Sequence, residues 1–317
     1  MWLICGTIPD ADFPLTEGGW SYDADAAELV LTERVRPEEG PELRVPAWRG
    51  TPALLAAALQ TARAMECRPC HALLAGDIGD GDGSAGLYAY LAARLAGTRA
   101  GNGAGLEEGR EGEQEEGGST FYGLTFHYLF PDLDGHNRVL AALESLEPRP
   151  LLCADAGFMY VAKMSGYASF YDLFTPDAGE LAFLADEKAP HPLYTRGFLG
   201  EGEADVPALI ERANAYGNAA RTLLVKGKTD VLARDGRVLD TVSEPQVPAL
   251  EAIGGTGDIV AGIATALLAC RVPMVAACLA AARAGRRAGE LARPTPATQV
   301  ADILPHIPQA VLEAMEA

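Results

Sequence analysis

Short runs of apolar residues alternate along this chain with longer stretches in which apolar residues recur at helical spacing. The strand-like runs are 71–76, 122–130, 150–154, 171–175 and 222–226. The helix-like stretches are 51–65, 85–96, 137–146, 258–270 and 273–292. Strands that alternate with helices usually pair in parallel, because each helix carries the chain back across the sheet. The pattern therefore predicts a mostly parallel sheet with helices on both of its faces.

Two segments depart from this alternation. Residues 1–50 are less regular and contain one clear strand, 28–33, so they are predicted to form a flap or an edge hairpin. Residues 97–118 are rich in glycine and glutamate and poor in apolar side chains. Burial of so few apolar groups would not offset the entropy lost on ordering. We expect an acidic, flexible insertion there; an acidic arm that binds a partner is the less favoured interpretation.

The charge of the chain restricts its partners. The formal net charge is -19, of which residues 107–116 contribute six glutamates against one arginine. An acidic surface repels phosphate backbones, so nucleic acid is not expected as a partner. The start of the chain has no basic segment typical of a signal peptide, and the longest apolar stretch, 259–270, is shorter than a bilayer span of about twenty residues. We expect a soluble, cytoplasmic protein that does not enter a membrane.

Six cysteines are scattered along the chain, and only Cys67 and Cys70 form a CxxC pair. This pair precedes the predicted strand 71–76, whereas a redox CxxC normally follows a strand. No histidine pair occurs at the spacing of a zinc finger, and the five histidines show no ligand spacing. The cysteines are therefore predicted to be reduced thiols without a specific role.

A glycine-rich turn, GGTGD at 254–258, leads directly into the apolar stretch 259–270. Glycines allow unusual dihedral angles and close backbone approach, so such a turn can direct several N–H groups at one place. The following helix adds its unpaired N–H groups and the positive end of its dipole. The segment predicts an anion hole formed by Gly254, Gly255, Thr256 and Gly257.

Asp258 stands inside this predicted anion hole, which is an unfavourable place for a carboxylate that only binds. The position makes sense if the carboxylate removes a proton from a hydroxyl while that hydroxyl attacks a phosphoryl group. Asp258 is therefore the candidate catalytic base. A tight turn with an acidic residue in the first turn of a helix remains the simpler interpretation of the turn alone. Gly257 is predicted to be the most sensitive position, because a β-carbon would resist the required dihedrals and crowd a phosphate.

Five motifs occur in order over the second half of the chain. They are CADAGF at 153–158, TPDAGE at 175–180, LLVKGKTDVLARDG at 223–236, VPALEAIGGTGDIVAG at 247–262 and TQVADILPHIPQAV at 298–311. They resemble, in turn, the DADALN strand end, TPHPGE, the strand–KG–strand nucleotide segment, NPALATGGTGDVLAG and the closing helix of one family. That family is the NAD(P)H-hydrate dehydratase (carbohydrate-kinase-like) family of the ribokinase-like superfamily.

The resemblance, which covers roughly residues 120–317, has consequences for fold and activity. It implies one domain over 1–317, a ribokinase-like three-layer α/β/α sandwich with a central, mostly parallel sheet. It also implies an enzyme that uses ATP or ADP with Mg²⁺ to phosphorylate a substrate hydroxyl and then eliminates phosphate. Hydrated NAD(P)H is the small-molecule substrate that the family name suggests, and the family is compatible with a homo-oligomer.

The same resemblance assigns roles to residues, each of which also has a structural interpretation. The residues implied in nucleotide binding are Lys226, Gly227, Lys228, Thr229 and Gly257, which could also form an ordinary hairpin and turn. Those implied in substrate binding are Asp155, Asp177 and Asp258, of which Asp155 could simply cap a strand end. Glu180 and Asp177 would order Mg²⁺ through water, or would simply start a helix.

Several motifs of the family are altered here, mainly on the substrate side. The glycine loop GPGLG aligns with FPDLDG at 130–135, which lacks the glycines, and Val247 replaces an asparagine. The N-terminal signature of the family is not recognisable in WRGTPALLAAAL at 48–59. Two other functions therefore stay open. One is a kinase for a small alcohol such as a sugar or a vitamin precursor, and the other is a catalytically silent nucleotide-binding regulator.

The aspartate-rich loop GDIGDGDGSAG at 76–86 has the carboxylates that a calcium site needs. Counting twelve residues from Asp77 or from Asp80 reaches Tyr88 or Leu91 rather than the glutamate of an EF-hand. The loop also lacks the lysine of a Walker A motif. It follows a predicted strand, so a ligand loop at the carboxyl edge of the sheet and a plain connecting turn are both consistent with the sequence.

Overall fold

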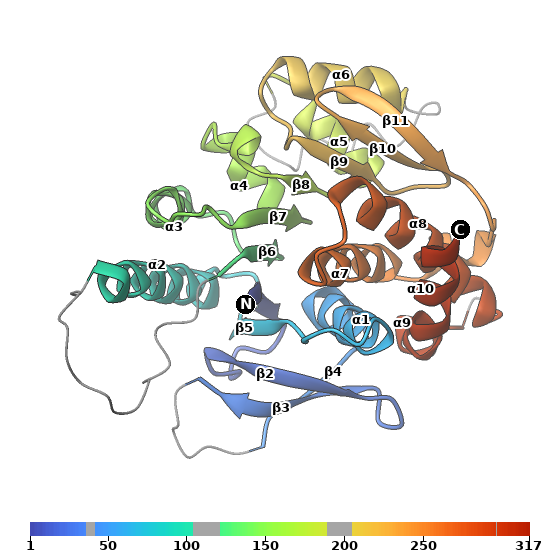
Figure 1. The fold of residues 1–317 in the computed structure, drawn as a ribbon, viewed down its shortest axis with the longest axis horizontal. Helices are drawn as coiled ribbons and strands as arrows, with labels where there is room; N and C mark the ends of the chain where they lie inside the picture. Colours follow the sequence, from blue (N-terminus) through green and yellow to red (C-terminus); the bar gives the residue numbers. More distant parts are fainter. Residues whose placement is uncertain (36–41, 104–120, 189–204, 296) are drawn as a thin grey trace, which may run out of the picture.

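The computed structural model describes residues 1–35, 42–103, 121–188, 205–295 and 297–317. Among these, eleven strands form one sheet in the order β11-β10-β9-β8-β7-β6-β1-β5-β2-β3-β4 (Figure 1). The strands are β1 (Trp2–Ile8), β2 (Thr16–Asp23), β3 (Glu28–Arg34), β4 (Arg44–Pro46), β5 (His71–Gly76), β6 (Gly123–His127), β7 (Leu151–Asp155), β8 (Leu173–Phe174), β9 (Thr222–Val225), β10 (Asp230–Arg234) and β11 (Arg237–Val242).

Six neighbouring strands in the centre of the sheet, from β9 to β5, pair in parallel. The remaining strands are antiparallel additions at the two edges: β10 and β11 on one side, and β2, β3 and β4 on the other. The mostly parallel sheet predicted from the alternation of strands and helices is confirmed. All six central strands end at the same edge, where open α/β sheets bind their ligands.

Helices cover both faces of the sheet (Figure 1). One face carries α2 (Asp82–Gly103), α3 (Leu133–Glu144), α4 (Phe158–Met164), α5 (Ala178–Leu184) and α6 (Val206–Ala215). The other carries α1 (Gly50–Ala64), α7 (Thr256–Ala269), α8 (Met274–Leu291), α9 (Val300–Ile303) and α10 (Ile307–Glu316). The short 3₁₀ turns are η1 (Ala168–Phe170), η3 (Pro248–Ala252) and η4 (Leu304–His306). This is the predicted three-layer α/β/α sandwich.

Strand β1 shows how the sheet divides the core in two. Successive side chains of a strand point to opposite faces. Trp2 and Ile4 accordingly join the cluster under α1 and α7, while Leu3 and Cys5 join the cluster under α2 and α3. The prediction of an irregular region over 1–50 is wrong for these residues, because β1 lies between β5 and β6 in the middle of the sheet. Its fully apolar sequence fits a strand buried on both faces. Strands β2, β3 and β4 do form an antiparallel edge.

The C-terminal ends of α1 and α7 are joined by a disulfide between Cys67 and Cys270, which are separated by 203 residues in the sequence. The prediction of six reduced thiols is therefore wrong for this pair. Cys70, the other member of the CxxC pair, is a buried free thiol, as are Cys5, Cys153 and Cys278. The pairing is not visible in the sequence, because it depends on two distant helices packing side by side.

Two loop regions stand out in the sequence. Helix α2 continues to Gly103, so the first residues of the 97–118 segment are helical, and the rest of that segment lies outside the described residues. The aspartate-rich loop connects β5 to α2 at the carboxyl edge of the sheet, and a ligand role for it stays a prediction. The carboxylate of Asp77 accepts hydrogen bonds from the N–H groups of Gly79, Gly81 and Ser84 and from the Ser84 hydroxyl, which closes the turn at the start of α2.

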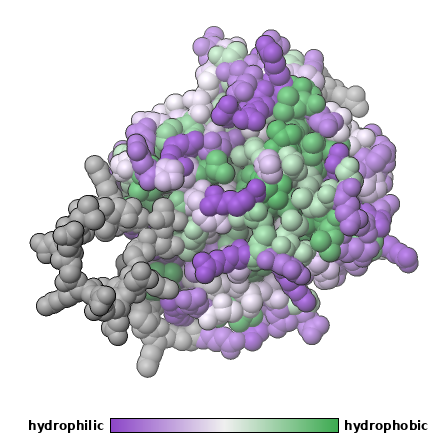
Figure 2. Space-filling view, in the orientation of Figure 1, coloured by the Kyte–Doolittle hydropathy of each residue, from purple (hydrophilic) through white to green (hydrophobic). Residues whose placement is uncertain are grey.

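The outer surface is mixed in character. On the face drawn in Figure 2, apolar side chains gather over the half of the molecule that holds β10, β11, α8 and α10. Exposed apolar residues there include Val238 and Leu239 on β11 and Leu312 on α10. Over the described residues, no helix combines the length and the apolar character required to cross a bilayer.

Candidate active site

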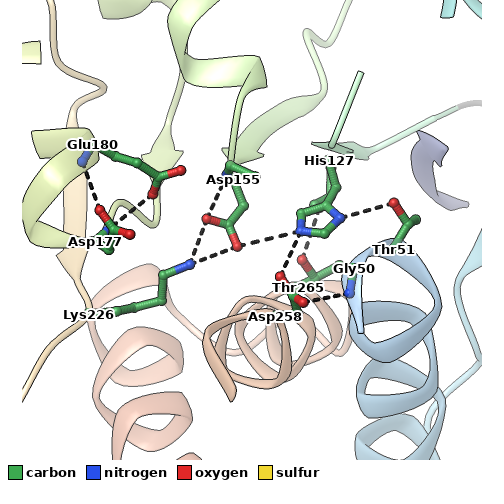
Figure 3. Close-up of polar contacts among 11 residues, drawn as sticks. Gly50, Thr51, His127, Asp155, Asp177, Glu180, Lys226, Asp258 and Thr265 are labelled. Carbon is green, nitrogen blue, oxygen red and sulfur yellow. Dashed lines mark hydrogen bonds and ion pairs between the residues drawn. The ribbon is translucent and has the colours of Figure 1, made fainter. Parts of the chain in front are cut away.

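A cavity of about 680 Å³ opens at the carboxyl edge of the sheet. Its walls come from the ends of β7 and β9, the first turns of α5 and α7, and the segment 246–251. Asp155 is the last residue of β7, and Lys226 follows β9 directly. Figure 3 shows how these side chains and Asp258 converge between the strand ends and the helix N-termini. The topology thus brings together residues that the sequence places on separate motifs.

Asp258 lies in the first turn of α7 and is 8% exposed. One carboxylate oxygen accepts a 2.7 Å hydrogen bond from the N–H of Gly50, the first residue of α1. The other lies 3.1 Å from Nε2 of His127. Burial opposes ionisation, but the hydrogen bond from His127, together with Lys226 and the N–H of Gly50, holds the pKa of Asp258 below its ordinary value. The carboxylate is therefore ionised and able to accept a proton at neutral pH.

The turn before Asp258 is built as a cap for α7. Gly255 is the N-cap residue, with φ of 99°, a left-handed conformation that favours glycine. The first hydrogen bond within the helix runs from Ile259 N–H to Gly255 O, so the N–H groups of Thr256, Gly257 and Asp258 have no partner within the helix. Such a first turn is suited to an anion.

The four predicted anion-hole residues do not contribute equally. Gly255, Thr256 and Gly257 line the cavity, whereas Gly254 is exposed and outside its wall. The dihedral argument for Gly257 is wrong, because the left-handed residue of the turn is Gly255. A β-carbon on Gly257 would instead lie 3.4 Å from Nζ of Lys226. Gly257 thus leaves space between the turn and the lysine.

Lys226 and Asp155 form a buried ion pair on the floor of the cavity. The ammonium lies 2.7 Å and 2.8 Å from the two carboxylate oxygens of Asp155. Burial alone would lower the pKa of Lys226, but the charges of Asp155 and Glu180 raise it above its ordinary value. Lys226 therefore supplies a fixed positive charge next to the helix N-terminus that carries Asp258.

Asp177 and Glu180 are joined in a capping box at the start of α5. The Asp177 carboxylate accepts the Glu180 N–H, and the Glu180 carboxylate accepts the Asp177 N–H. Each carboxylate keeps one oxygen outside this pair. Burial raises the pKa of Glu180 to about 8, Lys226 opposes the rise, and Asp155 and Asp177 add to it. The geometry is compatible with both predicted roles of this pair. One is to start the helix, and the other is to order Mg²⁺ through water.

The nucleotide segment is only partly at the cavity. Gly227 and Lys228 line it, while Thr229 is exposed and outside its wall. Arg286 of α8 holds this loop by donating hydrogen bonds to the carbonyls of Gly227 and Lys228 and by pairing with Asp230. Apolar residues close the adjacent wall of the cavity: Val247, Pro248, Leu250 and Val260.

Three contributors to the site were not identified from the sequence: Gly50, Thr51 and His127. His127 is completely buried at the end of β6, with Nδ1 3.0 Å from the hydroxyl of Thr51. The available signal was its place near the end of a predicted strand, since such ends meet at the ligand edge. Gly50 and Thr51 lie in the segment whose family signature is not recognisable. The backbone N–H of Gly50 has no sequence signal at all.

One atom each of His127, Asp155 and Asp258 lies within 4.8 Å of the other two, a spacing that could hold a metal ion. The Lys226 ammonium already contacts both oxygens of Asp155. We therefore assign the positive charge at this point to Lys226.

Comparisons with known proteins show which family this chain resembles. A family model described as NAD(P)H-hydrate dehydratase matches residues 133–309. An uncharacterized protein of Methanocaldococcus jannaschii is 33% identical over 81% of this chain and 98% of its own length. The ADP-dependent (S)-NAD(P)H-hydrate dehydratase of Cenarchaeum symbiosum is 32% identical over 49% of this chain, which spans about half (48%) of that relative. The crystal structure of a ribokinase-like superfamily protein from Enterococcus faecalis covers 100% of this chain and 88% of its own, with 12% identity and a TM-score of 0.56.

Proposed function

Because this chain belongs to the NAD(P)H-hydrate dehydratase family, we propose that it is a nucleotide-dependent enzyme of that type. It would transfer a phosphoryl group from ATP or ADP to the hydroxyl of a hydrated NAD(P)H and then eliminate phosphate to restore the reduced nicotinamide. The observation that carries the proposal is the placement of Asp258. An ionised carboxylate stands in the first turn of α7, beside the unpaired N–H groups of an anion site and facing a 680 Å³ cavity.

In the first step, Asp258 accepts the proton of the substrate hydroxyl as its oxygen attacks the terminal phosphorus of the nucleotide. The bond between that phosphorus and the bridging oxygen breaks, and the nucleotide leaves one phosphate shorter. The N–H groups of Thr256 and Gly257 stabilise the charge on the transferring group, with Lys226 beside them. Asp155 holds the Lys226 ammonium in place.

The nucleotide would lie along the wall formed by Gly227, Lys228 and the segment 246–251, with its phosphates toward Gly257. The apolar side chains of Val247, Leu250 and Val260 suit a base, and the N-terminus of α7 suits the phosphates. Asp155 and Asp177, which both lie beside Lys226, would contact the substrate. Thr229 is the one predicted nucleotide residue for which the geometry offers no contact.

The family implies Mg²⁺, and Asp177 with Glu180 fits it. Each of the two carboxylates has one oxygen outside the capping box, and burial, with the charges of Asp155 and Asp177 adding to it, raises the pKa of Glu180. Hard divalent cations prefer such oxygen ligands, often through water. Mg²⁺ bound there would neutralise charge on the phosphate oxygens. Binding of Mg²⁺ should release a proton near pH 8, which calorimetry in buffers of different ionisation enthalpy would detect without substrate.

A second function is favoured by the altered substrate side. His127 and Tyr128 occupy the end of β6 and the position after it, ahead of the segment that replaces the family's glycine loop, and Tyr128 lines the cavity. The same Asp258 could then serve a kinase for a small alcohol, without elimination.

Incubation with hydrated NADH and either ATP or ADP separates these functions. Recovery of the absorbance of reduced nicotinamide supports the dehydratase. A phosphorylated product from a panel of sugars and vitamin alcohols, without that recovery, supports the kinase. Nucleotide binding with no turnover of any acceptor would contradict both functions and indicate a silent regulator.

A further inference from the structure

We propose that His127 is a positioning residue: its imidazole, backed by the Thr51 hydroxyl, orients the Asp258 carboxylate toward the acceptor hydroxyl. The inference rests on the proposed role of Asp258 as the base. It adds a series of hydrogen-bonded side chains, one each from α1, β6 and α7, that holds this base in place. Figure 3 shows Thr51, His127 and Asp258 in line, with Gly50 completing the set.

The geometry at Asp258 requires a proton on Nε2 of His127. A carboxylate oxygen only accepts hydrogen bonds, and Nε2 lies 3.1 Å from it. The other oxygen is fixed by Gly50 N–H at 2.7 Å. With one donor on each oxygen, the plane of the carboxylate is set from two sides. Because His127 is fully buried, water does not compete for this contact.

Thr51 supports the tautomer that Asp258 selects. Its hydroxyl lies 3.0 Å from Nδ1 and can donate to this nitrogen when the proton of the neutral ring is on Nε2. The alternative tautomer, with the proton on Nδ1, would direct a lone pair at the Asp258 carboxylate. An orienting partner on the far nitrogen of a histidine fixes tautomer and ring position in many active sites.

The neighbouring strand leaves room for this chain of contacts. Gly6 of β1 pairs with His127 in the sheet. A β-carbon on Gly6 would lie 2.5 Å and 2.6 Å from the side chain of Thr51 and 2.7 Å from the carbonyl oxygen of His127. Real β-carbons do not come so close to other atoms. A side chain at this position would therefore push Thr51 away from the imidazole.

The other charged groups around His127 leave Asp258 as its partner. Asp155 of β7 lies 3.9 Å from Nε2, and its oxygens are taken by Lys226 at the end of β9. Tyr128 stands edge-on to the imidazole and is half exposed. The capping pair Asp177 and Glu180 lies on the side of Lys226 away from His127 (Figure 3).

Two substitutions of His127 test the role. A glutamine amide reaches about as far as Nε2, and an asparagine amide about as far as Nδ1. We expect His127→Asn to lower kcat by about 10- to 100-fold, the usual range for losing an outer orienting partner, and to leave KM for the nucleotide nearly unchanged. His127→Gln, which keeps a donor for Asp258, should retain kcat within about tenfold of wild type. In wild type, the hydrogen bond from His127 favours the ionised form of Asp258. Its loss in His127→Asn should raise the pKa of Asp258, so the acidic limb of the kcat/KM profile should move to higher pH.

His136→Gln is the matched control, because His136 is equally buried and lies outside the site. Its kcat should stay within a few-fold of wild type when corrected for the folded fraction. Wild-type kcat and an unmoved acidic limb in His127→Asn would overturn the inference. If His127→Asn fails to fold, Thr51→Val takes its place. Its kcat should fall, because the imidazole loses the contact at Nδ1, and a wild-type kcat would overturn the inference.

Nitrogen NMR of the imidazole gives a readout that needs no turnover. The His127 signals, assigned by their loss in His127→Gln, should report a proton on Nε2 in the wild type and a changed Nδ1 signal in Thr51→Val, which lacks the hydroxyl beside Nδ1. An Nδ1–H tautomer in the wild type would contradict the proposal. Full activity of Asp258→Asn would instead remove the proposed base, so the two failures are distinct.

Discussion

Two histidines, nine residues apart, are both fully buried but have very different surroundings. His127 ends β6 among charged groups, and each of its ring nitrogens lies within hydrogen-bond distance of a side chain. His136, on α3, is packed against Phe158 and Tyr171. Its Nε2 pairs with the Tyr171 hydroxyl, while its buried Nδ1 has no partner among the described residues.

The difference shows that burial alone does not give a histidine a function. Burial in an apolar core penalises the charged imidazole and lowers the pKa of His136 to about 4. At the site, His127 sits where two helix N-termini and three strand ends bring carboxylates together (Figure 3). We infer that His127 supports the catalytic base and that His136 contributes only to packing. Four experiments test this difference.

The largest effect is expected from removing the base that His127 contacts. Asp258→Asn should lower turnover by roughly 10²-fold or more, because the amide cannot accept the proton of the acceptor hydroxyl. Nucleotide affinity, measured by calorimetry, should change little. Turnover within a few-fold of wild type would remove both Asp258 as the base and the functional half of the contrast.

The next effect concerns the pH dependence of stability at His136. Its folded pKa of about 4 lies below the ordinary value of 6.5, so the unfolded chain binds a proton first as the pH falls. The contribution of His136 to the free energy of unfolding is complete above pH 6.5. It decreases by about 3 kcal/mol as the pH falls from 6.5 to 4. His136→Gln, which does not titrate, should lack this part of the pH dependence in urea melts. An unchanged pH dependence would show that His136 is protonated normally.

A third comparison uses the glycines beside the two histidines. A β-carbon on Gly6 would meet Thr51 at 2.5 Å, and one on Gly135 would meet Asp132 at 2.7 Å. Each alanine variant should lose about 1–3 kcal/mol of stability, the usual cost of overpacking. Only Gly6→Ala should also lower kcat of the folded enzyme, since it displaces Thr51 from His127. Equal losses of kcat in both variants would contradict the inference that only His127 supports catalysis.

The smallest effect is expected at Thr256, two residues before the base in the sequence. Thr256 lines the cavity, its hydroxyl donates to the carbonyl of Ile253 at 3.2 Å, and its proposed role uses only the backbone N–H. Thr256→Ser should therefore keep nucleotide affinity and kcat within a few-fold of wild type. A loss comparable with that of Asp258→Asn would mean that the side chain itself takes part in the chemistry.

The layers of the fold and one side of the site could be predicted from the sequence. Alternating apolar runs dictated a parallel sheet covered by helices, because strand and helix periodicities are local properties. The segment 254–258 and the motifs around Lys226 and Glu180 identified residues that the structure brings to one cavity, since strand ends and helix N-termini meet at the same edge. Helix capping at Asp177 was equally readable, because it involves residues only three apart.

Tertiary structure decided the rest. Gly50 and His127 reach Asp258 across 208 and 131 residues of sequence, and Thr51 reaches His127 across 76, through contacts that no local pattern encodes. The central position of β1 and the pairing of Cys67 with Cys270 depend on the same long-range packing. A backbone N–H or a single histidine carries no sequence signal of its partner. Its role arises only when the sheet places β1, β6 and β7 side by side and packs α1 against α7.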